Sequence, residues 1–441
     1  MTLPRYSAYR DSGVEWLGEM PAHWTTVRLG ALFREAVEEG CEGLPILSVS
    51  IHDGVSDREL AEEEMDRKVT RSDDVTKYRR VEPGDLVYNM MRAWQGGFGT
   101  VTVSGMVSPA YVIARPTTGL ATSFVEQLLR TSAAVEEMRR LSKGVTDFRL
   151  RLYWDEFKTL KIAVPPEHEQ ATIASFLDRE TAKIDGLVRE QERLIELLAE
   201  KRRAVVSHAV TKGLDPNAPM KDSGIDWLGE VPAHWEAYAL KRFWSVLDCK
   251  HVTAEFVDEG IPVASIREVQ SRYVDLGTAK MTTEAFYELL IGEGRRPEVG
   301  DLLFSRNATV GEVAEVADWH PPFAMGQDIC LLRKSAPEFS SAYLRHVLKA
   351  ASTIDQLACV MIGSTFKRVN VEEIRALMVP MPPADEQHAI STHLDAITAK
   401  FDALTTEAER AVALLKERRA ALISAAVTGK IDVRGFVEEA A

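Results

Sequence analysis

A long stretch of heptad-spaced apolar residues occurs twice in this chain, and it constrains the fold more than any other feature. The first copy spans residues 167–208 and the second spans residues 384–425. An offset of 217 residues keeps the copies in step, so that Glu169 matches Glu386. Each copy follows two consecutive prolines, which are tolerated at the start of a helix and break it elsewhere. Each copy is therefore predicted to form one long helix.

Both predicted helices carry apolar residues at spacings of three and four, which is the pattern of a coiled coil. These positions are Ile173, Leu177, Ile184, Leu187, Leu194 and Leu198 in the first copy and Ile390, Leu394, Ile397, Phe401, Leu404, Ala408, Ala411 and Leu415 in the second. A helix of roughly 40 residues is about 60 Å long and cannot bury such a stripe alone. We predict that the two copies pair. The alternative is two independent amphipathic helices, each lying on its own domain.

The repeat also includes a segment at the start of each half, here called the lead segment. Residues 11–24 return at residues 222–235 with changes at three positions. A unit of about 210 residues has therefore been duplicated. Its tryptophans are predicted to be buried anchors of the fold, and they are Trp16, Trp24, Trp227 and Trp235.

Between the lead segment and the helix, each half has the signals of a mixed domain. Gly84 and Gly300 each begin a Gly-Asp turn that leads into a short apolar run, as at the start of a strand. Residues 122–141 and 340–357 read as helices packed on that sheet. The predicted fold class is α+β, with two globular domains that are each followed by a long helix. The predicted boundaries are 1–165 and 213–382 for the globular domains, 166–212 and 383–430 for the helices, and 431–441 for a tail.

The composition limits where and how the chain could bind nucleic acid. A net charge of −14 and a pI near 5.3 argue against a protein that coats DNA by charge. Acidic residues gather at 35–42 and 57–66, so any such binding should be local, or shared with a more basic partner. The four cysteines are far apart and form no CxxC pair, as expected for reduced thiols. We see no membrane span or signal peptide, and we expect a cytoplasmic protein.

The sequence shows none of the common catalytic motifs. It has no GxxxxGK[ST] phosphate loop, no GxGxxG after a strand and no HExxH pair. The fragment His320-Pro321-Pro322-Phe323 resembles the Asn/Asp-Pro-Pro-aromatic motif of adenine methyltransferases, but His320 breaks the pattern. We interpret the fragment as a loop. No catalytic residue, metal site or cofactor is expected in this chain.

Residues of the types that read DNA gather in loops at matching places of the two halves. Arg, Lys, Asn, Gln and small hydroxyl side chains are those that bridge base edges. The predicted DNA-binding residues are Arg92, Gln95, Lys143, Thr146, Arg149 and Arg151 in the first half, and Arg306, Asn307, Thr309, Ser364, Thr365, Lys367 and Arg368 in the second. The loops at 89–97 and 305–311 differ, whereas the surrounding pattern repeats. This suits two recognition modules on one frame; the alternative is an ordinary solvated loop.

Together these motifs resemble the specificity subunit of type I restriction-modification systems over essentially the whole chain. The residues that carry the resemblance are Trp16-Leu17-Gly18 with Pro21 and Trp24 and their copy, Gly84-Asp85-Leu86, Asn89 to Gly96, Ser108 to Tyr111, the Pro-Pro and Glu-Gln pairs that open each helix, Gly300 to Arg306 and Gly363 to Phe366.

The resemblance implies a DNA-binding subunit without a catalytic site of its own. Two target recognition domains would each read one half of a split target in double-stranded DNA. Two antiparallel helices would separate these domains and dock two modification subunits, which bring S-adenosylmethionine and methylate adenine. Restriction subunits, the motor nucleases, would join with ATP and Mg for cleavage. The alternative from a different class is a non-catalytic two-domain adaptor that binds proteins, which the acidic pI favours.

Overall fold

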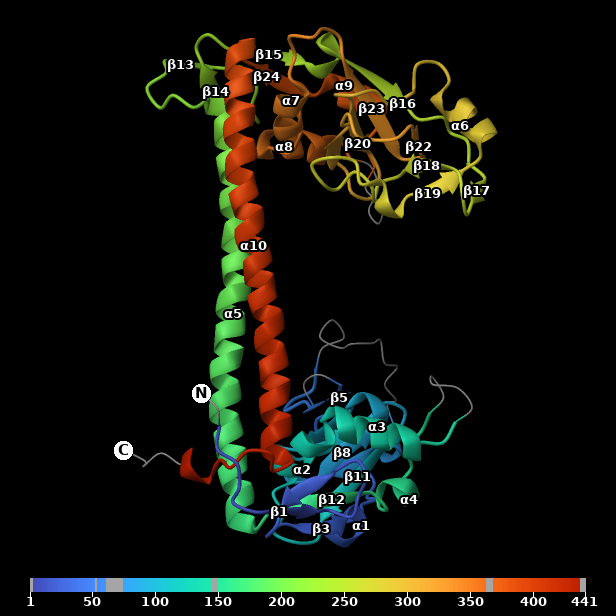
Figure 1. Ribbon diagram of the computed structural model, residues 1–441, viewed down its shortest axis with the longest axis vertical. Coiled ribbons are helices and arrows are strands. Elements are labelled where there is room, and N and C mark those ends of the chain that lie inside the picture. The colour runs from blue at the N-terminus through green and yellow to red at the C-terminus, as the bar shows by residue number, and fades with distance from the viewer. Residues whose placement is uncertain (1–2, 52–53, 61–73, 145–149, 362–367, 437–441) are drawn as a thin grey trace. The chain divides into compact units, whose positions relative to one another are not determined.

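The computed structural model describes residues 3–51, 54–60, 74–144, 150–361 and 368–436 of the chain (Figure 1). They form two compact units. Unit 1 comprises residues 1–191 and 410–441, and unit 2 comprises residues 192–409. Each unit therefore combines one globular domain with a part of both long helices. Among the described helices, none is long and apolar enough to cross a membrane.

The two long helices are α5 (Glu167–Lys212) and α10 (Ala384–Val427). Each begins directly after its proline pair and has acidic residues in its first turn, where the helix dipole stabilises them. In unit 1, Asp185 of α5 pairs with Arg419 of α10 at 2.8 Å, and in unit 2, Arg202 of α5 pairs with Asp402 of α10 at 3.5 Å. Residue numbers rise along one helix as they fall along the other, so the pairing is antiparallel. The predicted coiled coil is confirmed.

The seam between the helices differs from the prediction at three leucines. Leu187, Leu194 and Leu404 are 48%, 41% and 53% exposed. The buried side of α5 lies one residue further along, because Val188 is buried and Ile195 is half-buried. Helix geometry keeps the seam at alternating steps of three and four residues, even where a polar residue then occupies it. The prediction followed the more apolar leucines instead and was wrong at these positions.

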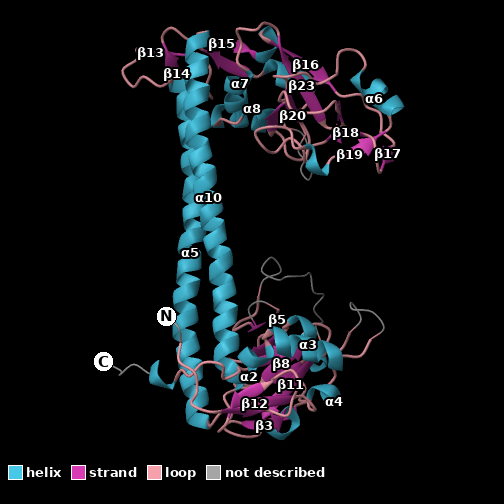
Figure 2. Cartoon of the chain, viewed as in Figure 1, coloured by secondary structure: helices cyan, strands magenta, loops and turns pink. Residues whose placement is uncertain are grey.

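Unit 1 is built on a four-stranded antiparallel sheet of order β4-β11-β8-β9. Its strands are β4 (Phe33–Glu35), β11 (Tyr111–Pro116), β8 (Leu86–Asn89) and β9 (Phe98–Thr100). Two of these strands, β8 and β11, are labelled in Figure 2. Side chains of β8 alternate between two buried clusters, as strand geometry requires. Tyr88 packs in the same cluster as Phe124 of helix α2 (Thr122–Leu129), whereas Val87 packs in another cluster with Ile113. The sheet is therefore covered on both faces.

Shorter elements surround this sheet. The paired strands are β1 (Tyr9–Asp11) with β2 (Glu19–Pro21), β3 (Thr25–Arg28) with β12 (Lys161–Val164), β5 (Val49–Ser50) with β6 (Gly54–Val55), and β7 (Arg79–Val81) with β10 (Gly105–Val107). The helices are α1 (Leu29–Leu32), α2 (Thr122–Leu129), α3 (Ser132–Leu141) and α4 (Trp154–Phe157), with 3-10 turns η2 (Val75–Lys77), η3 (Ala93–Gln95) and η7 (Arg434–Phe436).

Unit 2 repeats the four-stranded sheet, in the order β16-β23-β20-β21, and adds a second one. The strands of the first sheet are β16 (Trp244–Asp248), β23 (Ile329–Lys334), β20 (Leu302–Ser305) and β21 (Val313–Glu315). The second sheet, of order β17-β19-β18-β22, contains β17 (Phe256–Val257), β19 (Lys280–Thr282), β18 (Ile261–Ala264) and β22 (Ala324–Met325).

In the described part of unit 2, the remaining elements are two strand pairs and six short helices. The pairs are β13 (Met220–Asp222) with β14 (Glu230–Pro232) and β15 (Glu236–Ala239) with β24 (Met378–Met381). The helices are η5 (Leu240–Arg242), η6 (Leu276–Thr278), α6 (Glu284–Ile291), α7 (Ser341–Leu348), α8 (Ala351–Val360) and α9 (Val371–Ala376).

The two main sheets share their register as well as their strand order. Tyr111 of β11 pairs with Asn89, the last residue of β8. Ile329 of β23 pairs in the same way with Ser305, the last residue of β20. The duplication that the sequence predicts thus extends through both globular domains, and the α+β fold class is confirmed.

The lead segments anchor each domain on its long helix. Trp24 and Trp235 are fully buried, and their indole N–H groups donate to Glu169 at 3.1 Å and Glu386 at 2.8 Å. The prediction of buried anchors is therefore confirmed for these two tryptophans. It is wrong for Trp227, which is 44% exposed because it lies on the turn between β13 and β14.

Each long helix ends against a lead segment. Gly213, just after α5, and Gly429, just after α10, have φ of 75° and 72°. These left-handed conformations let the chain leave each helix and reach the following residues. In unit 1, the N–H of Asp432 then donates to the carbonyl of Pro4 at 2.8 Å. In unit 2, the chain continues from Gly213 into β13.

Candidate nucleic-acid interface

The predicted loop of the first half lies at the end of β8. Asn89 accepts a hydrogen bond at Oδ1 from the N–H of Met91 at 3.0 Å, which turns the chain into η3. Gly96 ends this turn with φ of 86°, a left-handed conformation that glycine adopts readily. Arg92 is half-buried and Gln95 is exposed. The amide of Gln95 is therefore open to solvent at the tip of a hydrogen-bonded loop.

A second segment of the first half lies beside this loop. Lys143 and Arg151 form an antiparallel β-bridge, with two backbone hydrogen bonds of 2.9 Å. The N–H of Leu152 donates to the carbonyl of Met90 at 2.8 Å and joins the segment to the end of β8. The hydrogen bond to Glu156 raises the pKa of Lys143, which stays charged. Thr146 and Arg149 lie outside the described residues.

The same joint exists in the second half, but its arginine is buried. The N–H of Val369 donates to the carbonyl of Arg306 at 3.0 Å, just as Leu152 donates to Met90. The Arg306 side chain is only 7% exposed, and its guanidinium pairs with Asp248 at 3.1 Å. Arg306 therefore serves the interior of unit 2, and its charge is not presented at the surface.

Asn307, Thr309 and Arg368 lie together at the surface of unit 2. Asn307 and Arg368 form an antiparallel β-bridge, and Arg368 is exposed. The amide of Asn307 donates to Asp328 at 3.1 Å, and the hydroxyl of Thr309 lies 3.1 Å from that of Ser305. Asn307 and Thr309 therefore hold the loop in shape, while Arg368 forms no ion pair with another residue that the structure describes. The other predicted residues here, Ser364, Thr365 and Lys367, lie outside the described residues.

The backbone is strained at this surface. Ala308 and Asp328 have φ of 56° and 73°, a conformation that costs free energy for any residue with a side chain. In the described part of the chain, only Glu293 besides these two is a non-glycine residue with positive φ. Such strain is found mostly at binding sites, where surrounding contacts keep the residue in place. The hydrogen bond from Asn307 to Asp328 is such a contact.

Sequence analysis missed the residues of a cavity next to this surface, here called the Gln327 cavity. Its volume is about 280 Å³. It is lined by Val252, Thr253, Ala254, Phe256, Val263, Ser265, Arg267, Lys280, Leu290, Gly326, Gln327 and Asp328. One signal was present, because Gly326-Gln327-Asp328 is a polar break between apolar runs. The remaining lining residues are scattered along the chain, so no sequence pattern connects them.

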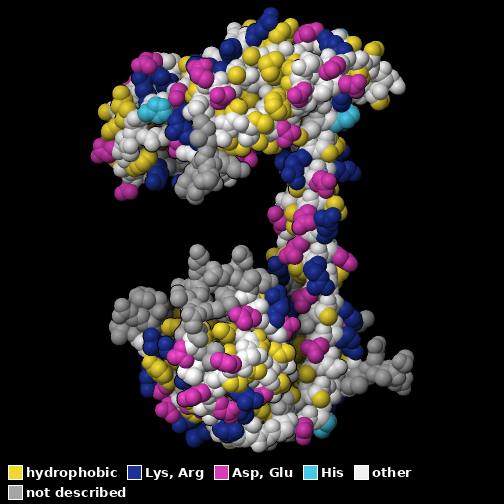
Figure 3. Space-filling model, turned by 180° about the vertical axis from the view of Figure 1, so that it is seen from behind, with side chains coloured by type: hydrophobic (Ala, Val, Ile, Leu, Met, Phe, Trp, Pro, Cys, Tyr) yellow, Lys and Arg dark blue, Asp and Glu magenta, His cyan; other side chains and the backbone are white. Residues whose placement is uncertain are grey.

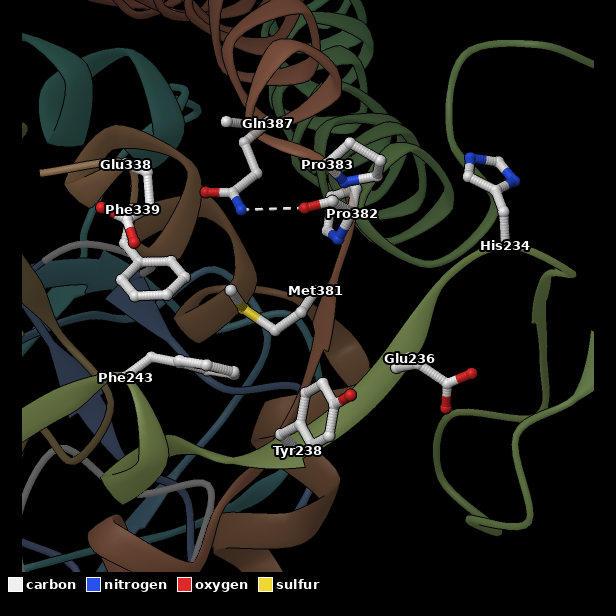
Figure 4. Close-up of a pocket in the computed structure, with 11 residues that line it drawn as sticks. His234, Glu236, Tyr238, Phe243, Glu338, Phe339, Met381, Pro382, Pro383 and Gln387 are labelled. Atoms are coloured by element: carbon white, nitrogen blue, oxygen red, sulfur yellow. Dashed lines mark hydrogen bonds between the residues drawn. The ribbon is translucent and has the colours of Figure 1, made fainter. Parts of the chain in front are cut away.

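A second cavity, of about 310 Å³, lies where α10 begins in unit 2 (Figure 4). Gln387 crosses one side of it and donates from Nε2 to the carbonyl of Pro382 at 2.9 Å. Its Oε1 accepts from the N–H of Ser340 at 3.0 Å. Gln170 makes the equivalent pair of bonds in unit 1. The glutamine of each Glu-Gln pair therefore fastens the start of a long helix to its domain, and this cavity belongs to that structural joint.

One group of side chains has the composition of a metal site but a different explanation. The ligand atoms of Asp248, Cys249 and His251 lie within 4.8 Å of one another. The guanidinium of Arg306 already pairs with Asp248 and would repel a cation. Burial raises the pKa of Cys249, so the thiol keeps its proton instead of acting as a thiolate ligand. These residues fit an internal ion pair better than a metal centre.

The surface charge is mixed, in line with local binding of DNA. Basic and acidic side chains are interspersed over the visible face of each unit (Figure 3). Contacts with a polyanion would therefore depend on the few cations of the loops described above and not on a broad basic face.

Comparison with known proteins shows which proteins this chain resembles. Residues 278–413 match the family described as type I restriction modification DNA specificity domain. This stretch includes Asn307, Gln327 and the first half of α10. The resemblance predicted from the sequence motifs is therefore confirmed.

Individual relatives of the chain are specificity subunits of type I restriction enzymes. The chain is 22% identical over 288 residues to the type I restriction enzyme MjaVIII specificity subunit of Methanocaldococcus jannaschii, covering 64% of either chain. It is 22% identical over 351 residues to the EcoKI specificity subunit of Escherichia coli, covering 74% of this chain and 69% of that one. The alignment with the archaeal relative thus spans less than two thirds of that protein.

Solved structures show the same fold. A chain described under "Structural basis underlying complex assembly and conformational transition of the type I R-M system" aligns with a TM-score of 0.70 and 15% identity, over 92% of this chain and 98% of that one. The HsdS subunit from Thermoanaerobacter tengcongensis aligns with a TM-score of 0.54 and 16% identity, over 93% and 98%. The two-domain α+β architecture with paired long helices is therefore a known fold.

Proposed function

We propose that this chain is the DNA-binding specificity subunit of a type I restriction-modification complex. Each unit would read one half of a split target in double-stranded DNA. The long helices would dock two modification subunits, and restriction subunits would join the same complex. S-adenosylmethionine, ATP and Mg would be bound by these partners and not by this chain.

One observation carries the proposal: the two units hold different side chains in the same frame. The backbone bond from Leu152 to Met90 in unit 1 corresponds to the bond from Val369 to Arg306 in unit 2. At the position where unit 2 has Gln327-Asp328, the shared register places Pro109-Ala110 in unit 1. Two units with the same backbone arrangement can make the same contacts with phosphates. Their contacts with bases must differ if the two units read different sequences. Two different half-targets require this combination.

Exposed leucines on the long helices support docking of partner subunits. In unit 1 these are Leu187 and Leu414, and in unit 2 they are Leu194, Leu197 and Leu404, all more than 40% exposed. Apolar side chains gathered on a helix surface mark sites of protein interaction when they occur in a contiguous patch. The modification subunits are the partners that the family relationship suggests for these surfaces.

The geometry of His320 supports a chain without its own methyltransferase site. Its Nδ1 accepts a hydrogen bond from the N–H of Ala317 at 2.9 Å, and its Nε2 lies 2.8 Å from the carbonyl of Val274. Both ring nitrogens are thus occupied in shaping a loop, as the sequence prediction had it. Neither is available to accept a hydrogen bond from an adenine amino group.

The experiment is to reconstitute the chain with its modification subunits and to map methylated adenines in DNA by sequencing. We expect one split motif with two halves of defined sequence, separated by a spacer whose bases are not read. The chain alone, as the control, should transfer no methyl group. A reconstituted complex that binds DNA without sequence preference, or not at all, would favour the protein adaptor instead.

A further inference from the structure

The Gln327 cavity lies beside the predicted DNA-binding residues of unit 2 and is held rigidly there. The N–H of Arg306 donates to the carbonyl of Asp328 at 2.9 Å. The carboxylate of Asp328 accepts from the amide of Asn307 at 3.1 Å. Asp328 is therefore fixed to the end of β20 through both backbone and side chain. The residue before it, Gln327, is exposed.

The amide of Gln327 is oriented but not fully used. Its Nε2 donates to the hydroxyl of Thr253 at 3.2 Å. A glutamine amide has two N–H donors and one carbonyl acceptor, so one donor and the acceptor have no partner among the described residues. An open donor beside an open acceptor matches adenine in the major groove, which accepts at N7 and donates from its N6 amino group.

Two cations lie on the rim of the same cavity. Neither Arg267 nor Lys280 forms an ion pair with a carboxylate in the described part of the chain, and both are exposed. The Lys280 ammonium lies 4.7 Å from the ring centroid of Phe256, a cation–π contact that limits its freedom. In a chain with a net charge of −14, two unpaired cations at one cavity favour a polyanionic ligand such as DNA.

We propose that Gln327 reads an adenine in the half-target of unit 2, while Arg267 and Lys280 bind phosphates beside it. This inference rests on the proposed function of the chain. It assigns the base contact to a residue on the β22–β23 loop, outside the clusters predicted from sequence. Unit 1 has Pro109 at the equivalent position, which offers no donor or acceptor in its side chain, so the contact belongs to one half-target only.

The test uses the reconstituted complex and duplexes that each change one base pair of the target found for the wild type. In Gln327→Ala, discrimination at one A·T pair should fall by roughly 5- to 100-fold while the other positions keep theirs. Arg267→Ala and Lys280→Ala should weaken binding equally for all duplexes and lower the salt slope by about one each. Gln270→Ala is the matched control, because Gln270 is exposed in the same unit but does not line the cavity.

Unchanged discrimination by Gln327→Ala at every position would overturn the inference and leave the proposed function intact. A wild-type complex without specific DNA binding would overturn both. Thermal melting of each variant separates loss of recognition from loss of folding. If Gln327→Ala does not fold, Gln327→Glu keeps the size of the side chain and removes the N–H donors, and it should show the same loss at the same base pair.

Discussion

Arginine is a residue type that often contacts DNA, but the side chain of Arg306 forms an ion pair inside unit 2. Its guanidinium pairs with Asp248, and its carbonyl and N–H connect β20 to Val369 and Asp328. Truncation of one partner leaves the other charge without compensation in a partly buried place. The side chain of Arg306 therefore contributes to the folding of unit 2 before any contact with DNA.

We expect Arg306→Ala to lower the free energy of unfolding by about 2–4 kcal/mol. Chemical denaturation of the purified chain measures this change. Arg368→Ala removes an exposed arginine from the neighbouring strand position and should change stability by less than about 0.5 kcal/mol. If the two variants were equally stable, the ion pair with Asp248 would not matter for folding.

Lys367 and Arg368 are two adjacent basic residues that the sequence predicts to bind DNA in the second half. Replacing both with Ala should weaken DNA binding of the assembled complex to a similar extent for all sequences. The salt slope should fall by about one for each lost phosphate contact. Binding titrations at several salt concentrations measure the slope, and unchanged affinity together with unchanged specificity would return these residues to an ordinary solvated loop.

At the scale of elements, Asp395 ties the globular part of unit 2 to α10. Its carboxylate accepts hydrogen bonds from Arg345 at 2.6 Å and Arg272 at 2.6 Å, and it lies 2.8 Å from Nε2 of His346. Burial raises its pKa, but the hydrogen bond from His346 and the charge of Arg345 outweigh burial and lower the pKa to about 2. The equivalent residue of α5, Asp178, is exposed.

This depressed pKa predicts how the stability of the chain depends on pH. An Asp whose pKa is lower in the folded state stabilises the fold above its unfolded pKa near 4 and loses that effect as pH falls towards 2. After allowance for solvent screening, the loss is about 1–2 kcal/mol. Asp395→Asn should lower the free energy of unfolding at pH 7 and reduce its change between pH 4 and 2. Asp178→Asn, the control, should do neither.

Burial lowers the pKa of His346, which therefore stays neutral in the folded chain. A histidine of this kind also makes the fold less stable as pH falls below its unfolded pKa of about 6.5. Unfolding measured between pH 7 and 5 separates this contribution from that of Asp395. A stability that did not depend on pH from 7 to 2 would contradict both assignments.

The long helices provide a prediction about target spacing. Four residues inserted between Leu187 and Leu194 lengthen α5 by about 6 Å. A matching insertion between Leu404 and Ala411 lengthens α10 equally. DNA rises about 3.4 Å per base pair, so the doubly lengthened complex should methylate a motif whose spacer is wider by one or two base pairs. Either insertion alone should destabilise the pair, because the seam then loses its register.

Sequencing of methylated DNA reads the spacer directly. Both half-targets should stay the same, which separates a change of spacing from a change of reading. A folded, active, doubly lengthened complex with its original spacing would show that the helices do not set the distance between the half-targets.

At the scale of the whole molecule, the repeated frame predicts that recognition is modular. Exchange of residues 1–165 with those of a relative should change one half of the methylated motif and leave the other half and the spacer unchanged. The physical reason is that the loops of each unit are held by bonds within that unit, such as those from Leu152 to Met90 and from Val369 to Arg306. A change in both halves, or in neither, would contradict modular reading.

Periodicity and repetition allowed much of this fold to be predicted from the sequence. The long helices follow from local spacing, and the duplication follows from matching segments. The seam at Val188 was missed because hydrophobicity favoured Leu187, whereas helix geometry decides. Burial of Arg306 depends on Asp248, and the Gln327 cavity depends on Arg267 and Lys280, all distant along the chain. Contacts of this kind leave no local pattern in a single sequence.

The ends of the long helices have a consequence for the topology of the chain. After α10, Gly429 brings the chain to Trp24 and Asp432 reaches Pro4, where the matching path after α5 runs from Gly213 to Trp235. In each unit, the chain thus leaves the end of a long helix along an equivalent path that packs against the lead segment of that unit. A circular permutant that joins the present ends and opens the chain at residues 214–218 would keep every helix, sheet and loop described above. Such a permutant would show whether the order of the two halves along the polypeptide matters for the fold.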